Sequence, residues 1–246
     1  MDRNLVMIFL EQLRKRLIIM AITVTVASIL CFYFVEPIRQ VLLLPGRGLQ
    51  IEMIFLTPSE VFMSNLRLAV VTGLVVSLPV ILYQVTALIG AVNRHFKKKA
   101  FFLAGAMFVL FVLGLSFSYF VVFPFALKFF LSFSRADLIP KFSINQYITF
   151  TVSFLAVFGL VFQLPLAFWF LGVAGLVSSS FLRRNRKYAL LVILIISAVL
   201  TPPDVFSQIM MAIPLTLLYE LGIVMVYFAR RDQKVRKRAL DQKAPG

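Results

Sequence analysis

Long runs of apolar residues alternate with short charged clusters along most of the chain. Four of these runs can each cross a hydrocarbon core of roughly 30 Å, which takes about 20 helical residues. The pattern places their spans at about 17–35, 68–90, 101–123 and 147–171. It therefore predicts an all-α integral membrane protein.

The last two apolar runs are less regular, and we place them at about 188–201 and 205–228. The first of them would be roughly 21 Å long as a helix, which by length alone is typical of a buried or re-entrant segment. Pro214 and Glu220 interrupt the second. We nevertheless predict that both cross, as a short pair. Residues 1–230 then form a single six-span membrane domain, followed by a basic tail over 231–246.

The basic residues support this topology, because cytoplasmic segments of membrane proteins are rich in Lys and Arg. The N-terminus, the 94–99 and 183–187 loops and the C-terminal tail together carry 19 of the 25 basic residues, and the opposite side carries 6. This split places both termini in the cytoplasm. It does so only if the last two runs cross as a pair.

Composition narrows the class of protein further. Of the 246 residues, 61% are apolar and 14% are charged, against about 25% charged in an average soluble domain. This excludes a soluble or disordered chain. The net charge of +15 lies in clusters between spans, which fits topology signals and not a nucleic-acid surface.

The sequence does not contain the motifs that are typical of metal-dependent enzymes and hydrolases. Cys31 and His95 are single residues of their types, and no CxxC, HExxH or GxSxG motif occurs. We therefore predict no catalytic residues, no metal site and no cofactor.

Two segments on the predicted outer side, at about 36–66 and 125–146, are long enough to carry structure of their own. They would brace the helices or bind a partner, or they would simply connect the spans.

A few polar residues lie within the apolar runs. Glu220 is a functional candidate, because an acid in lipid is costly unless it is paired or hydrated; the alternative is a structural pair or a side chain that reaches the interface. Gln163 beside Pro165 predicts a kink where another helix docks, or a hydrogen bond within the bundle. Ala69, Gly73 and Ser77 form a small-residue row that we assign to packing within the chain.

An ion or solute transporter is a further possibility. A proton or ion relay needs several buried titratable groups, and many transporters have inverted repeats. This chain has a single acid deep in a span and shows no such repeat. The pattern therefore argues against a transporter.

One motif is highly specific. The stretch 200–208 reads LTPPDVFSQ and is followed by AIP at 212–214 and by Glu220. This pattern resembles the TatC family, the polytopic core of the twin-arginine protein translocase. The resemblance covers roughly residues 8–230, and its other matches are LRKRL at 13–17, TPSEVF at 57–62, LPVILYQ at 78–84, YFVVFP at 119–124, and FG at 158–159 with Phe162 and Pro165.

The resemblance implies a fold and a function. The fold is a concave, glove-like bundle of six helices, of which the fifth and sixth are short. Such proteins bind twin-arginine signal peptides at the cytoplasmic face of the bacterial or archaeal cytoplasmic membrane. They recruit single-span partners of the TatA and TatB type, self-associate, and export folded proteins with the proton-motive force.

The chain departs from the family pattern at three glutamate positions. Gln12 stands in the N-terminal motif, Lys97 in the second-to-third loop and Gln163 in the fourth span. Leu88 and Ala91 replace the usual Phe and Pro before Lys97. Since a carboxylate binds arginine more strongly than an amide does, these changes indicate altered recognition of the arginine pair.

The resemblance also implies roles for single residues. Candidates for signal-peptide binding are Glu11, Gln12, Arg14, Arg16, Leu88 and Lys97. Candidates for partner contact are Gln163, Pro165, Thr201 and Gln208, and the retained polar or structural positions are Glu60, Tyr119, Pro124, Asp204 and Glu220. Glu11 would replace Gln12 only if the helix rotates or starts late, since neighbouring positions differ by about 100°; otherwise Glu11 pairs with Lys15.

Two functions remain open from the sequence. The first is a TatC-type translocase subunit that binds signal peptides. The second is a divergent paralogue with weakened or altered recognition that acts with a second TatC or accepts atypical signals.

Overall fold

The computed structural model describes residues 3–49, 52–54, 57–92, 100–132, 141–200 and 205–241, and these are almost entirely helical. Two compact units divide the chain, residues Met1–Ala156 and Val157–Gly246.

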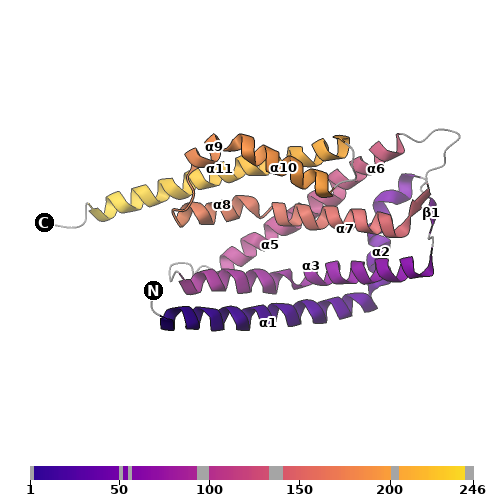
Figure 1. The fold of residues 1–246 in the computed structure, drawn as a ribbon, viewed down its shortest axis with the longest axis horizontal. Coiled ribbons are helices and arrows are strands. Elements are labelled where there is room, and N and C mark those ends of the chain that lie inside the picture. Colours follow the sequence, from indigo (N-terminus) through magenta and orange to yellow (C-terminus); the bar gives the residue numbers. More distant parts are fainter. Residues whose placement is uncertain are drawn as a thin grey trace. The chain divides into compact units, whose positions relative to one another are not determined.

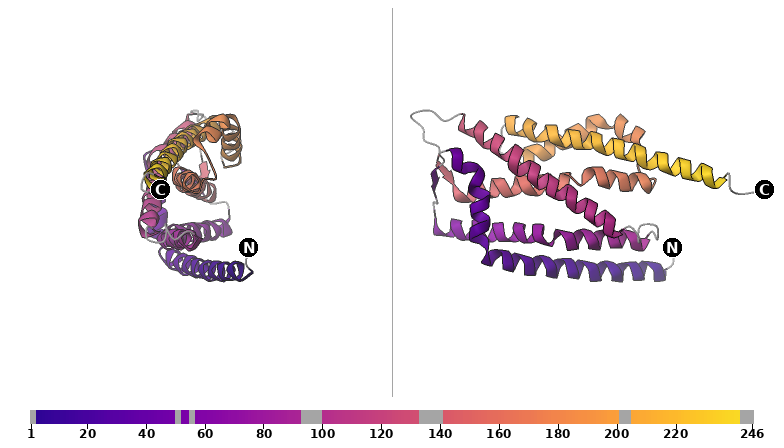
Figure 2. Two further views of the ribbon diagram at one scale, coloured as in Figure 1. Left: turned by 90° about the vertical axis from the view of Figure 1, so that its left-hand side faces the viewer. Right: turned by 180° about the vertical axis from the view of Figure 1, so that it is seen from behind.

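The first unit is built on two long helices that lie side by side, α1 (Arg3–Tyr33) and α3 (Pro58–Val92) (Figures 1 and 2). They run antiparallel, because Arg16 on α1 contacts Gln84 on α3 while Ser28 approaches Gly73. A Cβ on Gly73 would lie 2.5 Å from the Ser28 backbone. Ala69, Gly73 and Ser77 are all buried, so the predicted packing row is confirmed.

The helix α5 (Ala100–Phe117) crosses α3 diagonally (Figure 2) and continues through the π-helical turn η2 (Ser118–Val122) into α6 (Phe123–Leu131). Helix α7 (Ile144–Val161) is the last helix of this unit along the chain. Its buried Ile148 and Val152 pack with Leu68 of α3 and with Leu42.

The two predicted outer segments are structured over their described residues. The first contains α2 (Val35–Leu43), the 3₁₀ helix η1 (Leu44–Leu49) and strand β1 (Glu52–Ile54). The second contains β2 (Lys141–Ser143), which pairs in parallel with β1, with Met53 opposite Phe142. The pairing joins loops that are far apart in sequence, and this favours the predicted bracing role.

The second unit contains α8 (Leu164–Val173), α9 (Ser179–Arg184), α10 (Arg186–Leu200) and α11 (Val205–Asp241). Helix α8 lies along α11, and glycines allow the close approach, since Gly172 faces Val226 and Gly222 faces Phe168. In Figure 1, α9 and α10 lie beside α11.

The predicted kink at Gln163 is confirmed. A turn at Phe162 and Gln163 separates α7 from α8, which has Pro165 in its first turn. Proline is favoured there because the first helical N–H groups have no partner within the helix.

Five helices of the described chain are long and apolar enough to cross a membrane: Leu10–Tyr33, Ser59–Ala87, Phe101–Phe129, Ile144–Val173 and Gln208–Arg230. These agree with five of the predicted spans, and the all-α membrane class is confirmed. Helix α10 has 15 residues and is short, as expected for the fifth crossing.

The sixth helix corrects the sequence prediction. It is not short: α11 has 37 residues and continues to Asp241, into the segment that we expected to be a separate tail. The physical reason is local, because residues 230–241 are rich in Arg, Lys, Gln, Ala and Leu, which have high helix propensity.

Candidate functional site

The candidate signal-peptide residues of the first unit gather at one end of the α1–α3 pair. The guanidinium of Arg16 donates to Oε1 of Gln84 at 2.9 Å and to the Gln84 backbone carbonyl at 3.3 Å. Both side chains are half-buried. This contact fixes the register of the two helices at this end.

That register determines which other positions face each other. Gln12 lies one turn before Arg16 on α1, and Leu88 lies one turn after Gln84 on antiparallel α3. Since residues four apart share a helix face, Gln12 and Leu88 belong to the same row as the Arg16–Gln84 contact. These two positions thus lie one helical turn beyond the Arg16–Gln84 contact, and Gln12 is exposed there.

Glu11 lies on a different face of α1 from Gln12 and pairs with Lys15. Helix α1 is already continuous from Arg3, so Glu11 is displaced by about 100° around the helix. Its carboxylate lies 3.3 Å from the ammonium of Lys15, and both side chains are exposed, at 58% and 67%. This is the solvated pair at spacing four that the sequence offered as the alternative. Arg14 is also exposed.

Gln84 was not among the residues that the sequence indicated for signal-peptide binding. It was noted within the LPVILYQ stretch but not as a ligand. The signal was available, since Gln84 is a polar residue within the second predicted span.

The end of the first unit opposite the Arg16–Gln84 contact holds three of the other candidates. The hydroxyl of Ser143, at the end of β2, donates to the carboxylate of Glu60 in the first turn of α3. An acid at this position also suits the positive end of the helix dipole. The hydroxyl of Tyr119 in η2 donates to the carbonyl of Val41 at 2.5 Å. Pro124 follows in the first turn of α6.

In the second unit, Glu220 of α11 is paired. Its carboxylate accepts from the guanidinium of Arg186, the first residue of α10, at 2.6 Å. The adjacent Tyr219 hydroxyl donates to the Leu182 carbonyl of α9 at 2.9 Å. These two contacts hold the corner between α9 and α10 against α11.

Gln208 makes a hydrogen bond within the same unit. Its side-chain amide donates to the Leu194 carbonyl of α10 at 3.1 Å, so it joins the two helices near the end of α10. Gln163 is half-buried at the α7–α8 break. Lys97, Thr201 and Asp204 lie outside the described residues, and the side chain of Leu88 is not described.

Comparison with known proteins agrees with these features. A family model described as "Sec-independent protein translocase protein (TatC)" matches residues 8–214. The chain is 38% identical to the Sec-independent protein translocase protein TatC of Carboxydothermus hydrogenoformans, over 90% of this chain and 92% of the relative. It is 35% identical to TatC of Aquifex aeolicus, over 94% and 98%, and 34% identical to TatCy of Bacillus subtilis, over 92% and 90%.

A solved structure shows the same fold. It is titled "Crystal Structure of Twin Arginine Translocase Receptor- TatC" and superposes with a TM-score of 0.84 at 35% identity, covering 90% of this chain and 99% of that one. Identities of this size over nearly full lengths do not favour the alternative of a divergent paralogue.

Proposed function

The chain belongs to the TatC family of Sec-independent protein translocase proteins, and from that premise we propose that it is the receptor subunit of a twin-arginine translocase. Its role is transport rather than catalysis. The finer features of the proposal concern topology, signal recognition and partners.

For topology, the proposal is a single domain over residues 1–230 that crosses a bacterial or archaeal cytoplasmic membrane six times, with both termini inside. The 19-to-6 division of basic residues supports it. Helix α10 would be about 22 Å long at 1.5 Å per residue, so its crossing requires local thinning of the bilayer. The basic end of α11 then extends into the cytoplasm.

For signal recognition, the proposed site is the row formed by Gln12, Arg16, Gln84 and Leu88. The observation that carries it is the Arg16–Gln84 contact, in which amide and carbonyl oxygens already hold a guanidinium at 2.9 and 3.3 Å. The same groups can accept hydrogen bonds from an arginine of a signal peptide. A hydrogen bond with one charged partner contributes about 1.5–3 kcal/mol, so recognition here does not require a carboxylate.

Arg14, Lys97 and Glu11 lie around this row in sequence. Arg14 and Lys97 add positive charge that disfavours an arginine-rich ligand, while Glu11 supplies negative charge weakened by Lys15. We therefore assign the direct contacts to the glutamines and place the exposed side chains of Glu11 and Arg14 at the rim.

For partners, the proposal assigns the second unit to single-span proteins of the TatA and TatB type. Helix α10 leaves apolar side chains exposed along its length, among them Leu191 and Val199, at 56% and 78%. Gln163, Pro165, Thr201 and Gln208 are the proposed contact positions, with Glu60, Tyr119, Pro124 and Asp204 maintaining the outer face. Self-association and contact with lipid complete the assembly, and the proton-motive force drives export of folded cargo.

Complementation tests the function. The full chain is expressed in a bacterial strain that lacks its own TatC, together with TatA-type and TatB-type proteins from the same source as the chain. We expect a folded reporter behind a twin-arginine signal to reach the outer side. A signal with both arginines replaced by lysine is the control, and no export of the twin-arginine reporter would contradict the proposal.

A further inference from the structure

Four basic residues stand within five positions where α9 ends and α10 begins. We call them the basic corner: Arg183, Arg184, Arg186 and Lys187. Arg186 pairs with Glu220 at 2.6 Å, and Glu220 is the one acid of the second unit whose side chain the structure describes. The other three cations are exposed and form no ion pair with a described acid of this unit.

The basic corner lies beside the middle of an apolar helix. The carbonyl of Leu182, next to the corner, accepts a hydrogen bond from the hydroxyl of Tyr219 on α11. Arg186 contacts the following residue, Glu220. The candidate membrane span on α11 runs over Gln208–Arg230, so it continues for ten residues past Glu220, or roughly 15 Å at 1.5 Å per residue. The corner is therefore not level with the end of that span.

Helix α10 leads from the corner toward the other end of the same span. The carbonyl of Leu194 on α10 accepts a hydrogen bond from Gln208, the first residue of the candidate span. Exposed apolar side chains follow the corner directly, among them Tyr188, Leu190 and Val192. The resulting patch has cations at one end and an apolar helix surface at the other.

Two physical requirements apply to this patch. Arg and Lys side chains are unfavourable in hydrocarbon unless they are paired or reach headgroups or water. The exposed apolar side chains along α10 need apolar surroundings. A molecule with an anionic headgroup and apolar chains meets both requirements when its headgroup lies at the corner and its chains follow α10.

The charge of the corner decides among ligands. A twin-arginine signal peptide carries cations of its own, which the corner repels. A phosphate group is complementary, because a guanidinium donates two parallel hydrogen bonds to its oxygens, and Arg183 and Arg184 supply two such groups in the last turn of α9. The Lys187 ammonium, which lies over the Tyr188 ring at 5.0 Å, adds a third charge. Basic and aromatic side chains are both enriched where membrane helices meet the headgroups.

We infer that the basic corner binds the headgroup of an anionic phospholipid whose acyl chains lie along the first turns of α10. The inference goes beyond the proposed function, because it holds whether or not the chain binds a signal peptide. An acidic segment of a partner protein is the competing occupant, and the experiment distinguishes the two.

The test uses the purified full-length protein in detergent, with palmitoyl-oleoyl phosphatidylglycerol and the phosphatidylcholine of identical chains as probes. Native mass spectrometry measures the lipid retained at matched concentrations. We expect the wild-type protein to retain phosphatidylglycerol in preference to phosphatidylcholine. Arg183→Gln with Arg184→Gln should lower this preference about 25-fold, since each basic residue near an anionic membrane surface contributes about fivefold.

Two double variants are matched controls. Arg14→Gln with Lys15→Gln removes two exposed cations from α1 and should leave the preference unchanged, which separates the corner from any other basic cluster. Arg183→Lys with Arg184→Lys keeps both charges and should keep most of the preference. This second variant ensures that a folding defect at these positions does not decide the outcome.

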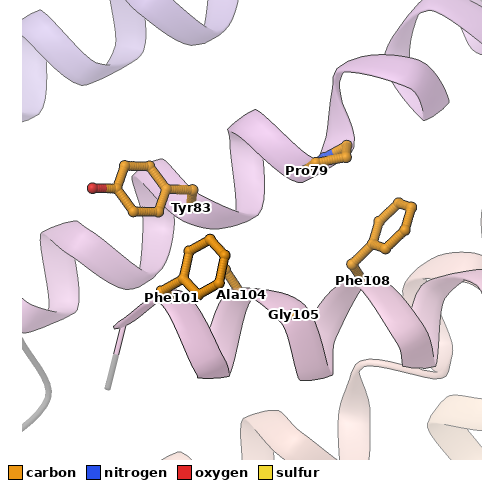
Figure 3. A pocket seen from close by; sticks show the side chains of 6 residues that line it. All are labelled: Pro79, Tyr83, Phe101, Ala104, Gly105 and Phe108. Atoms are coloured by element: carbon orange, nitrogen blue, oxygen red, sulfur yellow. The ribbon is translucent and has the colours of Figure 1, made fainter. Parts of the chain in front are cut away.

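The first unit offers another place where lipid can be retained. A groove of about 580 Å³ lies between α3 and α5, and Figure 3 shows Tyr83 and Phe101 at one end of it and Pro79 and Phe108 at the other. No charged residue belongs to the described lining of the groove, so this lining does not select a headgroup. Gly105→Leu, at a position where an added Cβ meets no atom within 4 Å, narrows the groove and should leave the preference for phosphatidylglycerol unchanged.

Three results would overturn the inference. The first is an unchanged preference in the variant Arg183→Gln with Arg184→Gln. The second is an equal loss of preference in the α1 double variant or in Gly105→Leu, which would assign the retained lipid to another place. The third is displacement of phosphatidylglycerol by polyglutamate at physiological salt, which would assign the corner to an acidic segment of a partner protein.

Discussion

Arg16 on α1 holds both oxygens of Gln84 on α3, the side-chain Oε1 at 2.9 Å and the backbone carbonyl at 3.3 Å. One side chain of the N-terminal motif thus satisfies a side-chain and a backbone acceptor on another span. Because the contact is half-buried, it stabilises the helix pair and also defines the row on which Gln12 and Leu88 lie.

We expect Arg16→Gln to destabilise the protein by about 1–2 kcal/mol, since a partly buried, charge-assisted hydrogen bond is lost. The midpoint of thermal unfolding in detergent would measure this. The control is Arg14→Gln, an exposed neighbour whose loss should change stability by no more than about 0.5 kcal/mol. Equal shifts of the unfolding midpoint in the two variants would show that the Arg16–Gln84 contact does not contribute to stability.

Gln12→Glu should tighten binding of a twin-arginine signal peptide about tenfold. A carboxylate in the Arg16–Gln84 row replaces an amide, and a carboxylate can bind a guanidinium through two parallel hydrogen bonds as an ion pair, which an amide cannot do. Binding to the purified protein, measured by titration at low and high salt, should show the gain mainly at low salt.

The matched control for this variant is Glu11→Gln, on the neighbouring position of the same helix turn. Because Glu11 is exposed and paired with Lys15, its removal should change affinity less than about threefold. If Glu11→Gln weakens peptide binding more than Gln12→Glu strengthens it, the contacts belong to Glu11 and the proposed row is wrong.

Gly73→Ala should destabilise the α1–α3 pair by about 1–3 kcal/mol, because an added methyl requires a backbone shift. The Cβ would lie 2.5 Å from the Ser28 backbone, which no side-chain rotation relieves. Gly105→Ala is the control with the same chemical change in open space, and it should be neutral or slightly stabilising, since Ala favours helix over Gly. Unfolding midpoints that move equally would contradict close α1–α3 packing.

The sequence was sufficient to predict those features of the fold that depend on residues close together in the chain. Apolar runs located the spans, the Gln163–Pro165 pair located the break between α7 and α8, and small residues at spacing four located the tight α1–α3 contact. Each of these follows from helix geometry within one segment. The length of the sixth helix was predicted wrongly for a reason that also lies in the local sequence. The residues expected to form a tail have high helix propensity, and they extend α11 to Asp241.

Contacts between distant segments were not predictable in the same way. The pairs Arg16–Gln84 and Glu60–Ser143 depend on the register of helices and loops separated by 68 and 83 residues. Apolar periodicity does not fix that register to a single residue. The β1–β2 pairing has the same origin, since three-residue strands carry too little pattern to be recognised.

Glu220 allows the sharpest distinction between a structural and a functional acid. Its carboxylate accepts from Arg186 at 2.6 Å, with the two side chains 41% and 54% exposed. A pair this exposed contributes no more than about 1 kcal/mol to stability. Glu220→Gln should therefore leave the protein folded while loosening the α9–α10 corner, and we expect export of a folded reporter to fall several-fold.

The charge-reversed double variant, Arg186→Glu with Glu220→Arg, decides between the two roles. If the pair acts by positioning α10 on α11, the reversal restores the attraction and most of the export rate. Lys187→Gln is the control, since Lys187 lies over the Tyr188 ring at 5.0 Å and not on Glu220. If export stays lost in the reversed variant although the protein is folded, the carboxylate at position 220 is needed for itself, and Glu220 is a functional acid of the translocase.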